Sequence, residues 1–123
     1  MRVIVAGGRN FVGNDTHRKW LRLQLMNMDT DLVLCGMAKG ADLFGKSVAV
    51  DLNIAVAEYP ADWNKYNRRA GYIRNKQMSE NADACILFPG GIGTEMMKVL
   101  SKEKRLILIE YNEELKLEQF YGS

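Results

Sequence analysis

Five short, mostly apolar runs, none of which alternates apolar with polar residues, most limit what this chain can fold into. The runs are Arg2–Ala6, Leu32–Cys35, Ile54–Ala57, Cys85–Phe88 and Leu106–Ile109. Segments with apolar residues at helical spacing separate them. Strands without alternation, joined through helices, are typical of a parallel sheet covered on both faces. The sequence therefore predicts a doubly wound α/β domain with about five parallel strands.

The helical segments complete a single domain. Helices are predicted over about Asp15–Met28, over a segment with Phe44, Val48 and Leu52, over Ala70–Asn81, and over a segment with Ile92, Met96 and Leu100. A chain of 123 residues that is 47% apolar is long enough for one core and too short for two. We expect one domain over residues 1–123, in which residues 110–123 form a mixed tail with a short helix as one option.

Composition argues against several partners. The 17 basic and 15 acidic residues are well mixed and give a net charge of +2. Because such a charge produces no field strong enough to hold a nucleic-acid backbone, we do not expect a nucleic-acid partner. Cys35 and Cys85 lie in apolar runs and His17 is the one histidine, so we expect buried thiols, a reducing compartment, no metal and no cofactor. No apolar run has the length of a signal peptide or membrane span, which predicts a cytoplasmic protein without a membrane partner.

Apolar residues of the tail and the seven methionines suggest an association between copies of the chain. The tail carries Leu115, Leu117 and Phe120. Apolar surface of this kind is often covered by a partner subunit. We expect a homo-oligomer, a dimer or larger.

Three glycine turns follow predicted strands and so should share one edge of the sheet. They are Gly7-Gly8, Gly36 to Gly40, and Gly90 to Gly93. In doubly wound sheets, ligands bind outside the carboxyl ends of the strands, where the strand order reverses. This edge is therefore the predicted binding site.

The last of these turns is the most informative. The strand Cys85–Phe88 stops at Pro89-Gly90-Gly91-Ile92-Gly93-Thr94, and a helical pattern begins at once. Glycines let the backbone approach a ligand, and the free N–H groups and dipole of a helix N-terminus favour an anion, most often phosphate. The Thr94 hydroxyl would add a further contact. The structural alternative is a turn that only needs unusual φ angles.

Two known nucleotide-binding motifs bear on this prediction. Residues 40–47 match the phosphate-loop pattern G-x-x-x-x-G-K-S. A working phosphate loop follows its strand directly, whereas here four residues separate Cys35 from Gly40, and Phe44, Val48 and Leu52 place Lys46 inside a helix. The G-x-G-x-x-G dinucleotide fingerprint is absent, because the segment from Gly7 to Gly13 has the wrong spacing. A phosphate-loop NTPase is kept as the weaker alternative.

Five blocks of sequence together resemble the short, single-domain YspA-like branch of the SLOG superfamily. The blocks are Gly7-Gly8-Arg9, Gly36-x-Ala38-Lys39-Gly40-Ala41-Asp42, Tyr59-Pro60-Ala61-Asp62-Trp63, Ala70-Gly71-x-x-Arg74-Asn75-x-x-Met78 and Phe88-Pro89-Gly90-Gly91-x-Gly93-Thr94. The resemblance implies a Rossmann-like, nucleotide-binding fold. It also implies two activities: binding of nucleotides related to NAD or ADP-ribose, or the cleavage of nucleoside monophosphates by the related LOG phosphoribohydrolases.

The resemblance to the hydrolases is incomplete at their glutamate pair. Those enzymes share the turn Pro-Gly-Gly-x-Gly-Thr-x-Glu-Glu, and Met96 and Met97 stand at the two glutamate positions of this chain. Glu95 lies one residue earlier, where a helix turns its side chain by about 100°. Arg74 matches the hydrolases' arginine. The catalytic candidates are therefore Arg74 and Glu95.

Each candidate for ligand binding also has a structural explanation. Arg74 is either a fork for phosphate oxygens or an exposed arginine lying over the sheet. Asp42 either accepts hydrogen bonds from a ribose or a base, or stabilises the helix dipole. Trp63, in an irregular linker over residues 61–69, either stacks on a base or covers the core. Arg9 would reach a phosphate, and His17 is expected on the surface. The full set of predicted ligand contacts is Gly7, Gly8, Arg9, Gly36, Lys39, Gly40, Ala41, Asp42, Trp63, Arg74, Asn75, Pro89, Gly90, Gly91, Gly93 and Thr94.

The sequence thus predicts a module that binds a phosphorylated nucleotide or a ligand related to NAD or ADP-ribose, with a role in nucleotide signalling as one setting. The alternative is hydrolysis of the N-glycosidic bond of a nucleoside monophosphate, with Asp42 or Glu95 as the carboxylate.

Overall fold

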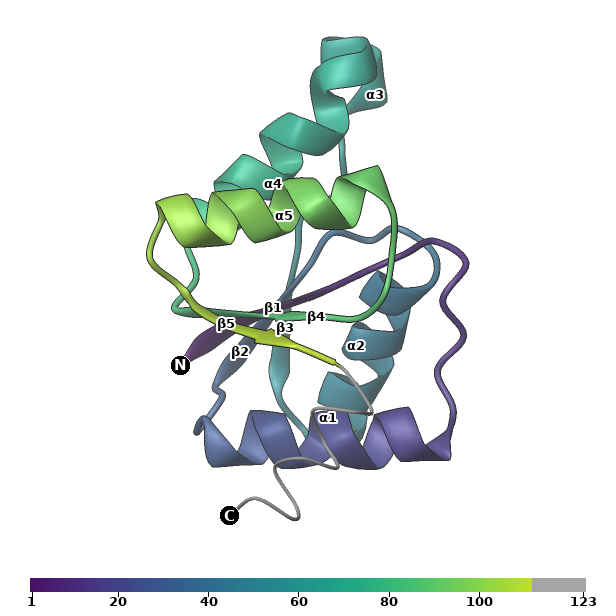
Figure 1. The fold of residues 1–123 in the computed structure, drawn as a ribbon, viewed down its shortest axis with the longest axis vertical. Helices are drawn as coiled ribbons and strands as arrows, with labels where there is room; N and C mark the ends of the chain where they lie inside the picture. The colour runs from purple at the N-terminus through teal and green to yellow at the C-terminus, as the bar shows by residue number, and fades with distance from the viewer. Residues whose placement is uncertain (112–123) are drawn as a thin grey trace.

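A computed structural model describes residues 1–111 and shows one five-stranded parallel sheet with helices on both faces (Figure 1). The strands are β1 (Arg2–Ala6), β2 (Leu32–Cys35), β3 (Ala55–Glu58), β4 (Ala84–Leu87) and β5 (Ile107–Glu110). They lie in the order β3-β2-β1-β4-β5, and every neighbouring pair is parallel. The predicted doubly wound fold is confirmed.

The helices form one layer on each side of the sheet (Figure 1). Helices α1 (Asp15–Asn27) and α2 (Ala41–Asp51) cover one face, and α4 (Ala70–Glu80) and α5 (Ile92–Glu103) cover the other. Because side chains alternate along a strand, β1 supplies both layers. Val3 and Val5 pack with α1 and α2, whereas Ile4 packs with α4 and α5.

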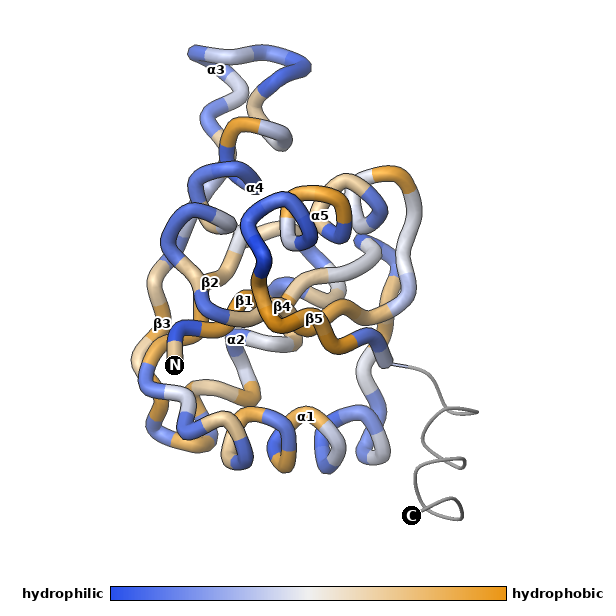
Figure 2. The backbone as a smooth tube through the Cα atoms, turned by 60° about the vertical axis from the view of Figure 1, so that its left-hand side comes forward, coloured by the Kyte–Doolittle hydropathy of each residue, from blue (hydrophilic) through white to orange (hydrophobic). Residues whose placement is uncertain are grey.

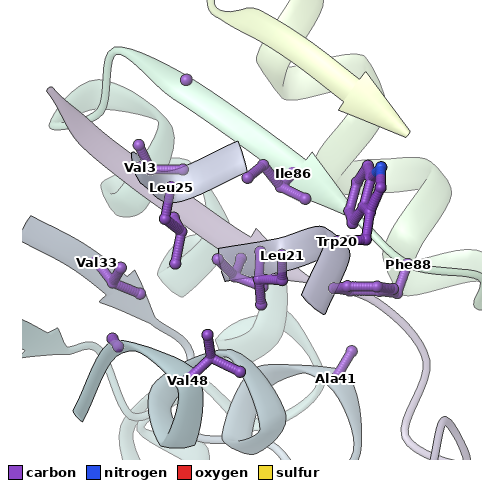
Figure 3. Packing of buried hydrophobic residues seen from close by; sticks show 12 residues of the cluster. Val3, Trp20, Leu21, Leu25, Val33, Ala41, Val48, Ile86 and Phe88 are labelled. Carbon is purple, nitrogen blue, oxygen red and sulfur yellow. The ribbon is translucent and has the colours of Figure 1, made fainter. Parts of the chain in front are cut away.

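Burial on both faces explains why the strands lack a polar alternation. In the layer under α1 and α2, Leu21, Leu25 and Val48 pack on Val3 and Val33, and all five are fully buried (Figure 3). Figure 2 shows the strands as an apolar band between more polar helices. Each of these aliphatic side chains contributes roughly 1.5–3 kcal/mol to folding.

The strand order places a crevice between β1 and β4. From β1 the chain proceeds outward through β2 to β3, and then returns to pair β4 against the free side of β1. The direction of winding therefore reverses between these two strands, and their carboxyl ends, Ala6 and Leu87, lie side by side.

The linker over residues 61–69 is more regular than predicted. It forms the one-turn helix α3 (Trp63–Tyr66) and the 3-10 turn η1 (Asn67–Arg69), which lead into α4. The Asp62 carboxylate caps α3 by accepting a hydrogen bond from the Lys65 N–H at 3.1 Å. A single turn is too short to show a helical period, so the prediction of an irregular loop was wrong.

The environment of His17 also differs from the prediction. The imidazole is half-buried and lies against the rings of Phe11, Phe88 and Tyr111. Its Nδ1 accepts a hydrogen bond from the Asn14 N–H at 3.0 Å, while Asn14 Oδ1 accepts one from the His17 N–H at 2.9 Å. This capping box fixes the start of α1. His17 is therefore a structural residue, not a surface one.

Two further sequence predictions concern the C-terminal tail and membrane-spanning helices. The predicted tail helix and Leu115, Leu117 and Phe120 lie outside the described residues. The longest described helix, α1, has 13 residues, and no helix within residues 1–111 has the length and apolar character to span a bilayer.

Candidate functional site

The turns that follow β1 and β4 are packed directly on each other. The Gly8 N–H donates to the Pro89 carbonyl at 2.9 Å. A Cβ on Gly8 would lie 2.9 Å from the Gly90 Cα, and a Cβ on Gly90 would lie 2.5 Å from the Gly8 nitrogen. The two backbones come this close because neither residue has a side chain. Gly8 and Gly90 therefore build the edge of the crevice.

The N-terminus of α5 opens beside this contact. Gly91 is the N-cap residue and supplies no side-chain cap, while its carbonyl accepts the N–H groups of Thr94 and Glu95 at 3.1 Å. An ideal Cβ on Gly91 or Gly93 meets no atom within 4 Å. The first N–H groups of a helix have no intrahelical partner, so this end of α5 offers donors and a positive dipole to open space.

A cavity of about 430 Å³ lies in front of this helix end. Its lining comes from the loop after β1, from α2, from the α3 to α4 segment and from α5. The predicted contacts Gly7, Gly8, Arg9, Asp42, Trp63, Arg74, Asn75, Gly91, Gly93 and Thr94 all line it. The volume lies within the range that encloses small ligands, roughly 300–1,000 Å³.

Arg74 is held in the wall of this cavity by two hydrogen bonds. Its Nη1 donates to the Gly36 carbonyl, and its Nε donates to Asn75 Oδ1 at 2.7 Å. Burial lowers the pKa of the guanidinium, although the Asp42 carboxylate opposes that effect. These two bonds, within residues 1–111, use two of its five N–H donors, so Arg74 keeps three for a ligand.

Asn75 links Arg74 to the opposite helix. The side chain is 8% exposed, and its Nδ2 lies 3.7 Å from the Met96 sulfur of α5. Both Met96 and Met97 line the cavity, and Met97 is also packed into the core, with 1% of its surface exposed. Where the resemblance to the hydrolases would require two carboxylates, this cavity has an apolar wall.

Among the described residues that line the cavity, Asp42 is the only one with a carboxylate. It is 6% exposed, and its Oδ2 accepts a hydrogen bond from the Ala38 N–H at 3.3 Å. Burial raises the pKa of this carboxyl to about 6, against the opposing effects of Arg74, the Ala38 N–H and Arg9. Gly36 leaves room for this group, because a Cβ there would lie 2.6 Å from Asp42 Oδ2.

The raised pKa of Asp42 predicts a specific pH dependence of stability. The folded protein binds this proton more tightly than the unfolded chain, so the free energy of unfolding falls as the pH rises from about 4 to about 6. The contribution of Asp42 reaches about 3 kcal/mol, from 1.36 kcal/mol per pKa unit. Denaturant unfolding at pH 4, 5, 6 and 7 should show this component in the wild type and not in Asp42→Asn. Equal pH profiles for the two proteins would contradict it.

Several predicted contacts lie elsewhere. Gly36 and Lys39 line a second, adjoining cavity. Gly40, Ala41, Pro89, Gly90 and Glu95 line neither cavity. Gly40 and Gly90 are needed for backbone packing, and Ala41 is fully buried. Glu95 is exposed on α5, so it does not stand in for the missing glutamates.

Residues 40–47 do not form a phosphate loop. Gly40 is the N-cap of α2, and Lys46 lies inside that helix. The Lys46 Nζ lies 2.6 Å from Glu58 Oε2 of β3, and Ser47 Oγ donates to the Phe44 carbonyl. The match to the motif is confined to the sequence.

Sequence reasoning missed part of the cavity lining. Ala6, Ala38, Arg68, Gly71, Ile92, Met96 and Met97 were not among the predicted contacts. Arg68 lies on η1 beside Arg69, and Trp63 and Tyr66 precede it in the same linker. This basic and aromatic composition could have indicated a ligand contact at Arg68. The apolar residues gave no such indication, because their chemistry also fits the core.

Comparison with known proteins gives one match. A family model for the YspA, cpYpsA-related SLOG family matches residues 1–66, which is more than half of the chain. No curated protein and no solved structure matches. The matched segment runs from β1 to α3 and includes Gly8, Arg9, Asp42 and Trp63 of the cavity. The chain belongs to the YspA, cpYpsA-related SLOG family.

Proposed function

We propose that this protein binds a phosphorylated nucleotide in the cavity between β1 and β4. Membership of the SLOG family indicates a nucleotide-related ligand. The observation that carries the proposal is the uncapped N-terminus of α5, whose open glycines Gly91 and Gly93 face a cavity also lined by Arg68 and Arg74. Helix N-termini with arginines beside them are strong phosphate sites.

The remaining lining suits the nucleoside. Trp63 is 49% exposed at the cavity wall and presents an aromatic face of the kind on which bases stack. Asp42 supplies an acceptor for a ribose hydroxyl or an exocyclic amine. In this arrangement the phosphate lies at α5 beside Arg74, the sugar next to Asp42, and the base against Trp63.

Binding is better supported than hydrolysis. A glycosidase needs a carboxylate at the reacting carbon, and the α5 positions that would supply it are Met96 and Met97. Glu95 lies outside the cavity lining. Asp42 would have to provide the charge from the α2 side, where burial favours its protonated form below pH 6.

Calorimetric titration with AMP tests the proposal. Arg74→Ala is expected to weaken AMP binding by at least about 10-fold, because a hydrogen bond to a charged group is worth about 1.5–3 kcal/mol. Arg22→Ala is the matched control, because Arg22 is exposed on α1, away from the cavity. Equal AMP affinity in these two variants would refute the role of Arg74. Chromatography of the same mixtures for free adenine tests the hydrolytic alternative.

A further inference from the structure

A second cavity adjoins the first at Trp63 and offers room for a base. Its volume is about 280 Å³, and its walls come from the loop after β2 and the segment after β3. Trp63 lines both cavities, while Met37, Pro60 and Ala61 add apolar surface to the second. Bases stack on aromatic side chains through their flat faces. A nucleotide with its phosphate at α5 and its base against Trp63 thus has the second cavity as the space for that base.

The polar side chains of the second cavity donate hydrogen bonds and do not accept them. They are Arg9, Lys39 and Arg74, and neither a guanidinium nor an ammonium group has an acceptor. Asp42 lines the first cavity and not the second. Within residues 1–111, the other side chains of the second cavity add an indole N–H, which is a donor, and a weakly accepting methionine sulfur. An amino group on the base would therefore meet donors here, whereas a keto oxygen would find a partner.

Lys39 is the donor that belongs to the second cavity alone. Arg9 and Arg74 line both cavities, and the proposed function assigns Arg74 to the phosphate. Lys39 lines the second cavity and not the first. Its ammonium group makes no hydrogen bond or ion pair with residues 1–111, so all three of its donors are available to a ligand.

The backbone on either side of Lys39 is held in place. The preceding residue, Ala38, donates its N–H to Asp42 Oδ2 at 3.3 Å. The following residue, Gly40, packs so closely that a Cβ there would lie 2.3 Å from the Gly8 carbonyl oxygen. The side chain of Lys39 therefore starts from a fixed point at the wall of the second cavity.

We infer that this site selects a purine nucleotide with a 6-keto group over one with a 6-amino group, and that Lys39 is the specificity-determining contact to the keto oxygen. The inference rests on the proposed function, which places the phosphate at α5 and the base against Trp63. A 6-ketopurine presents two neighbouring acceptors, O6 and N7, whereas adenine presents N7 beside an amino donor. Lysine and arginine are the usual protein partners of the O6 and N7 edge.

Calorimetric titration with inosine 5′-monophosphate (IMP) and AMP tests this selection. The two nucleotides differ only in the 6-substituent and in the proton that IMP carries on N1. The wild type should bind IMP about 10-fold more tightly than AMP, which is the discrimination expected of a cationic side chain on this edge.

Two substitutions of Lys39 assign the preference to this residue. Lys39→Met keeps a similar length but removes the donors, so the affinities for IMP and AMP should come within about 2-fold of each other. Lys39→Glu replaces the donors by an acceptor and should reverse the preference in favour of AMP. Repulsion between the new carboxylate and the phosphate affects both nucleotides alike and cancels in their ratio.

Two further variants are the controls. Trp63→Ala should weaken both nucleotides and leave their ratio unchanged, because stacking tolerates different bases. Lys19→Met, at an exposed position of α1, should change neither affinity. If the wild type binds IMP no more tightly than AMP, or if its preference survives Lys39→Met or Lys39→Glu, the inference is overturned while the proposed function stands. If the wild type binds neither nucleotide, the proposed function itself fails.

Discussion

Replacing Gly40 with alanine is expected to lower the free energy of unfolding by about 3–5 kcal/mol. Gly40 precedes α2 with φ +82° and ψ −126°, a conformation that side chains oppose. The new Cβ would lie 2.3 Å from the Gly8 carbonyl oxygen. Moving that oxygen away would disturb the hydrogen bond that it accepts from the Ala41 N–H at 3.1 Å.

Thermal and denaturant unfolding without ligand measure this effect. A loss of that size corresponds to a fall in melting temperature of more than about 10 °C in a domain of this size. Gly93→Ala is the matched control, because Gly93 lies in the first turn of α5 and nothing stands within 4 Å of its ideal Cβ. It should gain about 0.5–1 kcal/mol from helix propensity. Equal stabilities for the two variants would show that the close approach of Gly8 to Gly40 does not occur.

Replacing Gly91 with aspartate is expected to weaken AMP binding by more than about 100-fold. The substitution puts a carboxylate at the N-cap of α5, where it competes with the phosphate for the same N–H groups and repels it. Folding should be unaffected, since the position is open and aspartate is a favourable N-cap residue. Calorimetry with AMP and a melting curve for each protein measure both quantities.

Gly91→Ala is the control for the added side chain. It introduces a Cβ but no charge and no acceptor, so the α5 donors remain free, and AMP affinity should fall by no more than about 3-fold. If aspartate and alanine have the same small effect, phosphate does not bind at α5 and the placement of the ligand is wrong.

The elements of the fold were predictable because burial leaves a direct mark on the sequence. Every predicted strand is present, and their bounds differ from the structure by one residue at most. Strands covered on both faces must be apolar at every position, as Val3, Ile4 and Val5 are. The order in which strands pair leaves no such mark, so the sequence predicted a site along one edge of the sheet but not that the crevice lies between β1 and β4.

The sequence shows where the glycines lie, but not which of them serve packing and which border the cavity. Gly40, Gly90, Gly91 and Gly93 all read alike as parts of turns. In the structure the first two are needed because backbones meet there, and the last two border open space. That distinction depends on contacts between turns more than 30 residues apart in the chain, which no local pattern records.

Contacts between distant aromatic residues were missed for the same reason. His17 was predicted to be a surface residue because it lies in the first helical segment, away from the strand ends. The rings that surround it come from Phe11, Phe88 and Tyr111, in three separate segments. A lone histidine in a polar helix turn gives no sign of them.

The two tryptophans occupy opposite environments, and this gives the protein an optical signal of its own. Trp20 is 9% exposed and packs edge-on against Phe88 and Tyr111, whereas Trp63 is 49% exposed and lines both of the adjoining cavities. Fluorescence from Trp20 should report on the intact core. Fluorescence from Trp63, at longer wavelength, should change when a ligand displaces water from its indole ring. Occupancy and folding can thus be followed separately in one unlabelled sample.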